Sequence, residues 1–483
     1  MDKALIDRPT GPAVVVQNSS AVSDQTQILV FPSPGQGHMS PMIQFSKRLA
    51  SKGVRVTLVI TTTSSNSIQT HANSFKVEVI SDGSEQGNKK SETIEEYLER
   101  FRRVTTHTLA NLIITKIKTS TCTPGASESE FKLLVYDSSM PWLSDIAQQH
   151  GIAFAPFFTQ SCAVTAIYHQ FHQGAFMTEP SATATMLLPC LPPLGIKDVP
   201  SFLYDHAKSY PSLFNSSRDQ FSNLSEAKCL LWNTFDLLED EVLEWMTSTL
   251  SRSIMTIGPT IPSMFLDKRF EDDLDYSFNL YSPNVDACMK WLDCQEIGSV
   301  VYVSFGSYAS PSKDQMEEIA WGLKNSNYNI LWVVKQSEKE KLPINFVEGI
   351  SEKGLVVSWC SQLQVLAHKA VGCFVTHCGW NSILEALSLG VPMVAMPQWS
   401  DQTTNAKFIE DVWKTGVRVK VNEKLGVATR DEIAWCITTV LEEGSGMEMR
   451  KASLKWKRLA KEAVDVGGSS DKNMDELVAK LEL

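Results

Sequence analysis

Residues 359–402 constrain the fold of this chain more than any other stretch. The apolar run 371–375 predicts a buried parallel strand, and the apolar residues between 381 and 389 recur at helical spacing. Gly390, which precedes a Val-Pro pair, marks the end of that helix, and the run 393–397 predicts the next strand. The stretch therefore predicts one β-α-β unit, with a polar loop before the helix and a second polar loop after the following strand.

The polar loop before this helix is a candidate anion site. Such loops lie at the carboxyl edge of a parallel sheet, where α/β proteins bind ligands, and the free N–H groups of a helix N-terminus favour phosphate. His377, Asn381 and Ser382 add donors, and Glu385 is placed to accept hydrogen bonds from hydroxyls such as a ribose diol. Taken alone, Ser382 and Glu385 are better explained as a capping box. The tryptophans around them and the acid–amide pair that ends the stretch have no capping role.

The whole stretch resembles the 44-residue donor-binding signature of plant family-1 UDP-sugar glycosyltransferases, and it matches at nearly every diagnostic position. The resemblance implies that Trp359 stacks on uracil, because an indole face suits a flat base. It also implies that the backbone of Cys360 pairs with the base, and that Gln362 and Glu385 hold the ribose. Many members have Ala-Pro where this chain has Cys-Ser at 360–361, a change that a backbone contact tolerates.

The resemblance assigns the remaining signature positions to the diphosphate and the sugar. The implied diphosphate ligands are His377, Asn381 and Ser382, and the implied sugar ligands are Trp380, Asp401 and Gln402. A terminal glutamine usually accompanies glucose rather than galactose in this family. Two residues outside the signature join these sets by resemblance. Ser307, at the Gly-Ser end of the predicted strand 299–307, lies near the diphosphate or glucose, and Thr159, at the end of strand 151–159, contacts the transferred sugar.

A second β-α-β pattern opens the chain, with predicted strands at 27–32 and 54–61 around a glycine-rich turn and a helix. This pattern invites a dinucleotide-binding interpretation. However, Ser40 stands where the third glycine should be, and no acidic residue follows until Glu78, too far to bind a ribose from the second strand. We therefore exclude NAD binding.

His38 lies at the turn between the first strand and its helix. Spacing alone favours a turn histidine without chemistry. The positive end of the helix dipole disfavours imidazolium there, so we expect a neutral ring that can accept a proton. In the resembled family Gly-His-x-x-Pro carries the catalytic base, and residues 37–41 match it. Asp137 follows the predicted strand 131–136, and by position alone it would cap the next helix. The resemblance implies instead that Asp137 is the carboxylate that orients His38.

Acceptor-binding residues are the least specified by the sequence. Aromatic residues, including Tyr168, recur at helical spacing in 161–174, and a core helix explains them as well as an acceptor wall does. The proline-rich segment 187–203, which ends at Leu203, predicts a loop over the acceptor. The resemblance implies acceptor contacts in this region, and Gln36 and Ser400 complete the expected acceptor set.

Composition excludes several other classes of function. The net charge of −11 argues against a nucleic-acid or anionic-membrane partner, and no apolar run is long enough to span a membrane. The ten cysteines form no C-x-x-C pair and no signal peptide precedes them, so we expect reduced thiols and a cytoplasmic protein. No metal or cofactor is expected, because the Asp-x-Asp at 273–275 lies in a linker and helix N-termini can hold the donor phosphates.

The chain is long enough for two domains, and we expect an α/β protein. The resemblance implies the GT-B architecture, in which two Rossmann-like doubly wound domains face each other across a cleft. The expected boundaries are a disordered leader at 1–24, an acceptor-binding domain at 25–258, a linker at 259–290, a UDP-sugar-binding domain at 291–460, and a C-terminal helix at 461–483 that packs back on the first domain. We expect a monomer.

The implied reaction is inverting transfer of glucose from UDP-glucose to a hydroxyl of a small apolar acceptor, with a steroid or terpenoid favoured. Phenol, carboxylate and thiol acceptors remain alternatives. A sugar-nucleotide epimerase on the same fold would need acid and base carboxylates and no apolar acceptor pocket. A non-catalytic binding protein would keep the donor signature and lose the base, so the presence of His38 and Asp137 argues against it.

Overall fold

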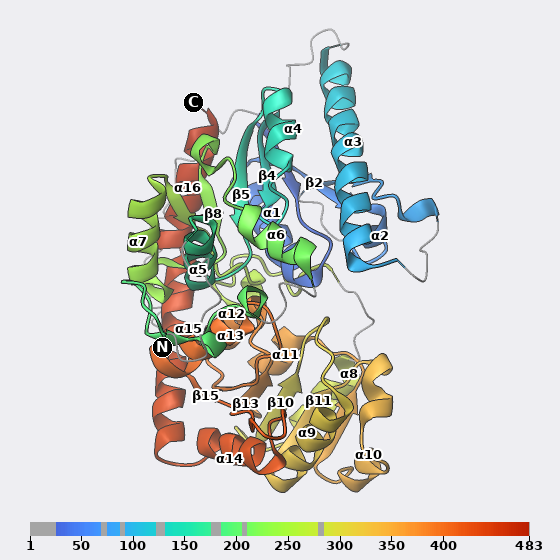
Figure 1. Cartoon of the computed structure of the whole chain (residues 1–483), viewed down its shortest axis with the longest axis vertical. Coiled ribbons are helices and arrows are strands. Elements are labelled where there is room, and N and C mark those ends of the chain that lie inside the picture. Colours follow the sequence, from blue (N-terminus) through green and yellow to red (C-terminus); the bar gives the residue numbers. More distant parts are fainter. Residues whose placement is uncertain are drawn as a thin grey trace, which may run out of the picture.

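The protein is described by a computed structural model that covers residues 26–68, 75–86, 92–121, 131–174, 185–204, 210–278 and 285–482. The predicted leader lies outside these residues. Two parallel sheets organise them, one in each half of the chain (Figure 1), which confirms the predicted α/β class with two doubly wound domains. A short antiparallel pair, β6 (Thr185–Met186) and β7 (Leu194–Gly195), lies outside both sheets.

In the first domain the strand order is β3-β2-β1-β4-β5-β8-β9, and each neighbouring pair is parallel. The strands are β1 (Gln27–Phe31), β2 (Arg55–Thr61), β3 (Lys76–Ile80), β4 (Phe131–Asp137), β5 (Ala153–Phe158), β8 (Leu230–Trp232) and β9 (Ile254–Thr256). The helices are α1 (Gln36–Ser51), α2 (Thr62–Ser65), α3 (Ile94–Thr121), α4 (Leu143–Gln149), α5 (Cys162–His172), α6 (Pro211–Asp219) and α7 (Asp240–Leu250).

The second domain has the strand order β12-β11-β10-β13-β14-β15, again parallel throughout. Its strands are β10 (Val300–Ser304), β11 (Asn329–Val333), β12 (Gly354–Val357), β13 (Val371–Thr376), β14 (Met393–Ala395) and β15 (Gly416–Arg418). The remaining helices are α8 (Val285–Asp293), which begins within the predicted linker, α9 (Lys313–Asn325), α10 (Phe346–Gly349), α11 (Gln362–Ala367), α12 (Trp380–Leu389), α13 (Gln402–Lys407), α14 (Arg430–Leu441), α15 (Ser445–Val464) and α16 (Ser469–Glu482).

Each central strand is buried on both faces, which explains why its sequence is a continuous apolar run rather than an alternating one. In β1, Leu29 and Phe31 enter one hydrophobic core, while Ile28 and Val30 enter another on the opposite face. The second core includes apolar residues of α1 and of the C-terminal helix α16, which lies beside the first domain in Figure 1. The last helix of the chain therefore completes the first domain rather than the second.

Both sheets reverse their strand order at one point, between β1 and β4 in the first and between β10 and β13 in the second. Ligands of open α/β sheets bind in the crevice outside the carboxyl ends of the strands at such a reversal. The fold thus directs attention to the loops after four strands, β1, β4, β10 and β13.

Candidate active site

The residues predicted to be catalytic follow the reversal point of the first sheet. His38 lies in the first turn of α1, directly after the loop that follows β1, and Asp137 is the last residue of β4. The two side chains meet: Nδ1 of His38 is 2.7 Å from Oδ2 of Asp137. Thr159, which follows β5, places its hydroxyl oxygen 3.0 Å from the same Nδ1. Three strand ends therefore converge on one imidazole.

This contact fixes the tautomer of His38. Asp137 is fully buried, and its Oδ1 accepts hydrogen bonds from the backbone N–H of Ser139 at 3.0 Å and from the Ser139 hydroxyl at 2.6 Å. Its other oxygen therefore requires a donor from the imidazole, so Nδ1 carries the proton. Nε2 is left as an acceptor, which is the state that a general base needs. The hydrogen bonds, together with the charge of His38, hold the pKa of Asp137 below its ordinary value although burial acts in the opposite direction.

The pKa of His38 corrects one expectation. Burial lowers it, but the charge and hydrogen bond of Asp137 and the charge of Asp401 outweigh burial, so the pKa lies above its ordinary value. The position at a helix N-terminus predicts the opposite direction, and that prediction is wrong because a carboxylate in contact outweighs a helix dipole. The imidazole is consequently a stronger base than a helix-terminal histidine without a partner.

At the reversal point of the second sheet lies the predicted diphosphate loop. The ring of His377 sits between two glycines, because a Cβ on Gly306 would lie 2.7 Å from its Nε2 and a Cβ on Gly379 only 2.5 Å. Burial lowers the pKa of His377 to about 4, so the ring is neutral. Its Nδ1 is buried and has no hydrogen-bond partner of standard geometry among the described residues, although the Ser304 backbone interacts with the ring. An unpaired polar atom at the N-terminus of α12 fits an anionic ligand.

The helix that carries this loop also contacts the first domain. Asn381, the second residue of α12, donates through Nδ2 to the carbonyl oxygen of Gly37 at 2.9 Å. Because Gly37 precedes His38, this bond joins the N-termini of α1 and α12 and brings the catalytic pair next to the predicted diphosphate loop. Ser307, in the loop after β10, offers its carbonyl oxygen to Lys335 Nζ at 3.0 Å.

Residues predicted to bind the nucleoside form one network around a buried carboxylate. Gln362 donates to Ser382 Oγ and to Glu385 Oε2, both at 2.8 Å, and Tyr302 donates to the Gln362 oxygen at 3.2 Å. Tyr276, which no sequence motif singles out, donates to Glu385 Oε1 at 2.8 Å. Burial raises the pKa of Glu385 to about 7, against the effect of these hydrogen bonds. Next to this network, Trp359 is half-buried and Cys360 is buried.

At the sugar end, Asp401 and Gln402 lie at the start of α13. Burial raises the pKa of Asp401 to about 6, while the Asn405 amide donates to its Oδ2 at 2.8 Å. Gln402 Oε1 accepts from the backbone N–H groups of Gln398 at 2.9 Å and Trp399 at 3.2 Å, so its NH₂ group is the part that remains for a sugar hydroxyl. Asn405 also accepts from the Ser161 hydroxyl at 3.0 Å and thereby attaches this loop to the first domain.

The side chain of Trp380 has a different role from the predicted sugar contact. It is 4% exposed, its Nε1 donates to the carbonyl oxygen of Asn233 at 2.7 Å, and its ring lies 6.0 Å from that of Trp413. The indole therefore packs between the domains. The backbone N–H of Trp380, at the first position of α12, is the group that this geometry leaves for a ligand.

The predicted acceptor residues come from both domains. Tyr168 on α5 is buried, and its hydroxyl lacks a hydrogen-bond partner of standard geometry among the described residues, as does Gln36 Oε1. Ser400 has a left-handed backbone, with φ of 59°, and exchanges two hydrogen bonds with Ser201: its N–H donates to Ser201 Oγ at 2.6 Å and its carbonyl accepts from the Ser201 N–H at 2.9 Å. Leu203, two residues on, is half-buried against the core.

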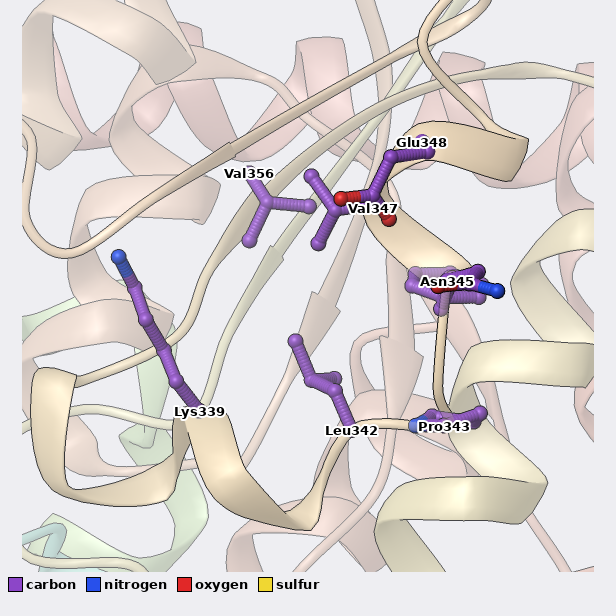
Figure 2. A pocket seen from close by; sticks show the side chains of 8 residues that line it. Lys339, Leu342, Pro343, Asn345, Val347, Glu348 and Val356 are labelled. Atoms are coloured by element: carbon purple, nitrogen blue, oxygen red, sulfur yellow. The ribbon is translucent and has the colours of Figure 1, made fainter.

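A pocket of about 210 Å³ elsewhere in the second domain does not compete with this site (Figure 2). It lies between η7 (Gln336–Lys341), α10 and β12, and its charged lining residues Lys339 and Glu348 are exposed. No predicted site residue lines it. Among the described residues no group of three His, Cys, Asp or Glu side chains is arranged to hold a metal ion.

Comparison with known proteins agrees with the geometry. Residues 26–454 match the family model described as UDP-glucoronosyl and UDP-glucosyl transferase. The chain belongs to the plant family-1 UDP-glycosyltransferases. It is 50% identical to mogroside I-E synthase of Siraitia grosvenorii, over 94% of this chain and 98% of that protein, and 47% identical to UDP-glycosyltransferase 74E1 of Arabidopsis thaliana, with the same coverage.

The solved structure of Os79 from O. sativa in complex with UDP superposes on this glycosyltransferase with a TM-score of 0.85. The two sequences are 36% identical, over 94% of this chain and all of that one. The GT-B architecture implied by the sequence is therefore confirmed. The enzyme transfers sugar from a UDP-sugar to small molecules. Within the described residues, no helix of this glycosyltransferase has the length and apolarity needed to cross a bilayer.

Donor affinity of this glycosyltransferase is expected to rise with pH through the pKa of Glu385. That pKa is about 7. The family resemblance implies that Glu385 accepts from both ribose hydroxyls, which only the carboxylate can do, so we expect binding to be impaired below this pKa and fully developed above it. UDP-glucose should bind about tenfold more tightly at pH 8 than at pH 6, because the ionised fraction of a group with pKa near 7 grows by that factor. Calorimetric titration measures the effect. In Glu385→Gln most of the pH dependence should disappear, and a dependence that persists unchanged would contradict the assignment.

Proposed function

We propose that this enzyme transfers glucose from UDP-glucose, with inversion, to a hydroxyl of a small apolar acceptor of the terpenoid or steroid class. The observation that carries the proposal is the hydrogen bond between Gly37 and Asn381. It brings a histidine whose Nδ1 proton is held by Asp137 next to the N-terminus of α12. A general base and an anion-binding helix terminus on opposite domains suit a displacement at a carbon between them.

In the proposed reaction the acceptor oxygen attacks the anomeric carbon while Nε2 of His38 removes its proton. The new bond forms between that oxygen and the anomeric carbon as the bond to the β-phosphate oxygen breaks, and UDP leaves with the electron pair. Asp137 stabilises the imidazolium that results. A single displacement inverts the α-linkage of UDP-glucose into a β-glucoside.

The negative charge that develops on UDP requires stabilisation. The N-terminus of α12, the neutral ring of His377 and the hydroxyls of Ser382 and Ser307 supply donors and a favourable dipole for it. We propose that these groups replace a divalent metal ion. Activity should accordingly be unaffected by EDTA.

Preference for glucose is proposed from Gln402, the terminal residue of the donor signature. Its amide oxygen accepts from two backbone N–H groups, which fixes the orientation of the side chain and leaves the NH₂ group as the donor for a sugar hydroxyl. A donor in a fixed position can distinguish the hydroxyl configuration that separates glucose from galactose.

The acceptor class is proposed from the apolar contacts around Ser400. Phe202 and Tyr210 of the first domain lie 5.6 Å and 6.0 Å from the ring of Trp399 of the second. Tyr168 and Leu203 belong to the same hydrophobic cluster, and an apolar lining suits a bulky apolar acceptor. The relative named mogroside I-E synthase supports the terpenoid class.

Mass spectrometry of the products tests the proposal. The protein is incubated with UDP-glucose or UDP-galactose and a panel of triterpenes, steroids, phenols, aromatic acids and thiols. We expect a gain of one hexose on a triterpene or steroid alcohol, with UDP-glucose as the better donor and a β-anomeric proton in the NMR spectrum of the product. An α-glucoside would contradict inversion, and a product only from phenols, acids or thiols would contradict the acceptor class.

A further inference from the structure

The interdomain linker is attached to the first domain on both sides of Tyr276. Gln44 Nε2 and Lys47 Nζ of α1 both donate to the carbonyl oxygen of Asp275 at 3.1 Å. The same two side chains bind Oδ1 of Asp273, at 3.2 Å and 2.6 Å. On the other side of Tyr276, Phe278 is buried in the core of the first domain and pairs with Ile68 in an isolated bridge. The backbone around Tyr276 is therefore held by the helix that carries His38.

The side chain of Tyr276 points to the other domain. Its hydroxyl donates to Oε1 of Glu385 at 2.8 Å, while Gln362 donates to Oε2 at 2.8 Å. Each carboxylate oxygen has two acceptor positions, so each can still accept one hydroxyl of a ribose. With one fixed donor on each oxygen, the plane of the carboxylate and its free acceptor directions are set. Without Tyr276, Oε1 would have no fixed donor, and Gln362 alone would set the orientation of the carboxylate.

We propose that Tyr276 is a positioning residue of the donor site, which orients Glu385 toward the ribose hydroxyls and makes the interdomain linker part of nucleoside recognition. The proposal rests on the proposed role of Glu385 as the ribose ligand. Tyr276 lies outside the donor signature, and its backbone is held by the domain that carries His38. The hydrogen bond between Tyr276 and Glu385 therefore both joins the two domains and orients a residue of the nucleotide site.

A purely structural role for the same bond makes a different prediction. If Tyr276 only joined the domains, its loss would weaken every nucleotide alike, whether or not the ribose has hydroxyls. If it acts through Glu385, its loss should weaken only ligands whose ribose hydroxyls bind that carboxylate. The two roles are separated by pairing a protein variant with a ligand variant.

The experiment measures the affinity of UDP and of 2′,3′-dideoxy-UDP by calorimetry for the wild type and for Tyr276→Phe. Phenylalanine keeps the ring and removes only the hydroxyl. We expect Tyr276→Phe to weaken UDP about tenfold, as for a hydrogen bond to a charged group, and dideoxy-UDP by less than about twofold. Tyr328→Phe, which removes a hydroxyl in the second domain outside this network, is the matched control and should leave both affinities unchanged.

A second comparison keeps the test independent of domain packing. In the Glu385→Ala background, adding Tyr276→Phe should change UDP affinity by less than about twofold, because the side chain through which Tyr276 acts is gone. Equal losses for UDP and dideoxy-UDP, or no loss for either, would overturn the proposal. If the wild type bound both nucleotides equally, Glu385 would not be a ribose ligand, and the proposed role of Tyr276 would be refuted as well. Transfer of glucose, measured as product, could still be observed in that case, so the two failures are distinguishable.

Discussion

Replacing His38 by alanine is expected to lower the rate of sugar transfer to an alcohol about 10³-fold, within the range for loss of a general base. The imidazole contacts Asp137 and Thr159 of its own domain, whereas the bond to the donor-binding domain runs through the carbonyl oxygen of Gly37. Alanine keeps that carbonyl, so UDP affinity should stay within about twofold. Single-turnover rates and calorimetry measure the two quantities separately.

The acceptor offers an internal control for the same variant. An acceptor that is already ionised at neutral pH, such as an aromatic carboxylate, needs no base, so its loss of rate in His38→Ala should be much smaller than that of an alcohol. His107→Ala, at an exposed position of α3, controls for removal of a histidine and should leave both rates unchanged. An alcohol rate in His38→Ala within tenfold of the wild type would refute the base assignment.

Features encoded in contiguous sequence could be predicted most completely. The β-α-β unit of residues 359–402 contains its own strand, helix stop and polar loops, and the structure has β13, α12 and β14 in those places. Buried parallel strands leave long apolar runs, so the central strands of both sheets were predictable too. The edge strand β3 was not predicted, because a partly exposed five-residue segment leaves no such run.

Contacts between distant segments could not be predicted from the pattern. Tyr276 and Glu385 are 109 positions apart, and the tyrosine lies in a linker with no periodicity that would single it out. Asn405, which holds Asp401, lies three residues beyond the end of the donor signature. Trp380 was assigned to the sugar by resemblance, whereas its indole is taken up by Asn233 and Trp413 in the folded chain. Such roles depend on which surfaces meet after folding.

The direction of the His38 pKa shift shows the same limit in energetic terms. A sequence reveals that the histidine starts a helix, which predicts a lowered pKa. The family resemblance pairs Asp137 with His38, but the residue pattern alone does not show that the carboxylate at the end of β4 is buried and lies 2.7 Å from the imidazole. When two electrostatic effects oppose each other, distance decides, and distance is a property of the fold.

Replacing Asp137 by asparagine is expected to cost between about 10² and 10⁴ in the rate of transfer, because it favours the wrong tautomer of His38. Oδ1 of residue 137 accepts from the Ser139 backbone N–H, which only an oxygen can do. The asparagine must therefore turn its NH₂ group toward Nδ1 of His38. That nitrogen then becomes an acceptor and the proton moves to Nε2, the atom that should receive the acceptor's proton.

The pKa of His38 provides a second measurement on Asp137→Asn. The charge of Asp137 raises that pKa, so the variant should show a lower one in an NMR titration of the imidazole. UDP affinity should be unchanged, since the side chain of Asp137 forms its hydrogen bonds with His38 and Ser139 of the first domain. Asp145→Asn, on the exposed surface of α4, is the matched control. Because the shape of the side chain is retained, a rate close to that of the wild type would mean that tautomer control contributes nothing, and His38 would have to act as a base without its carboxylate.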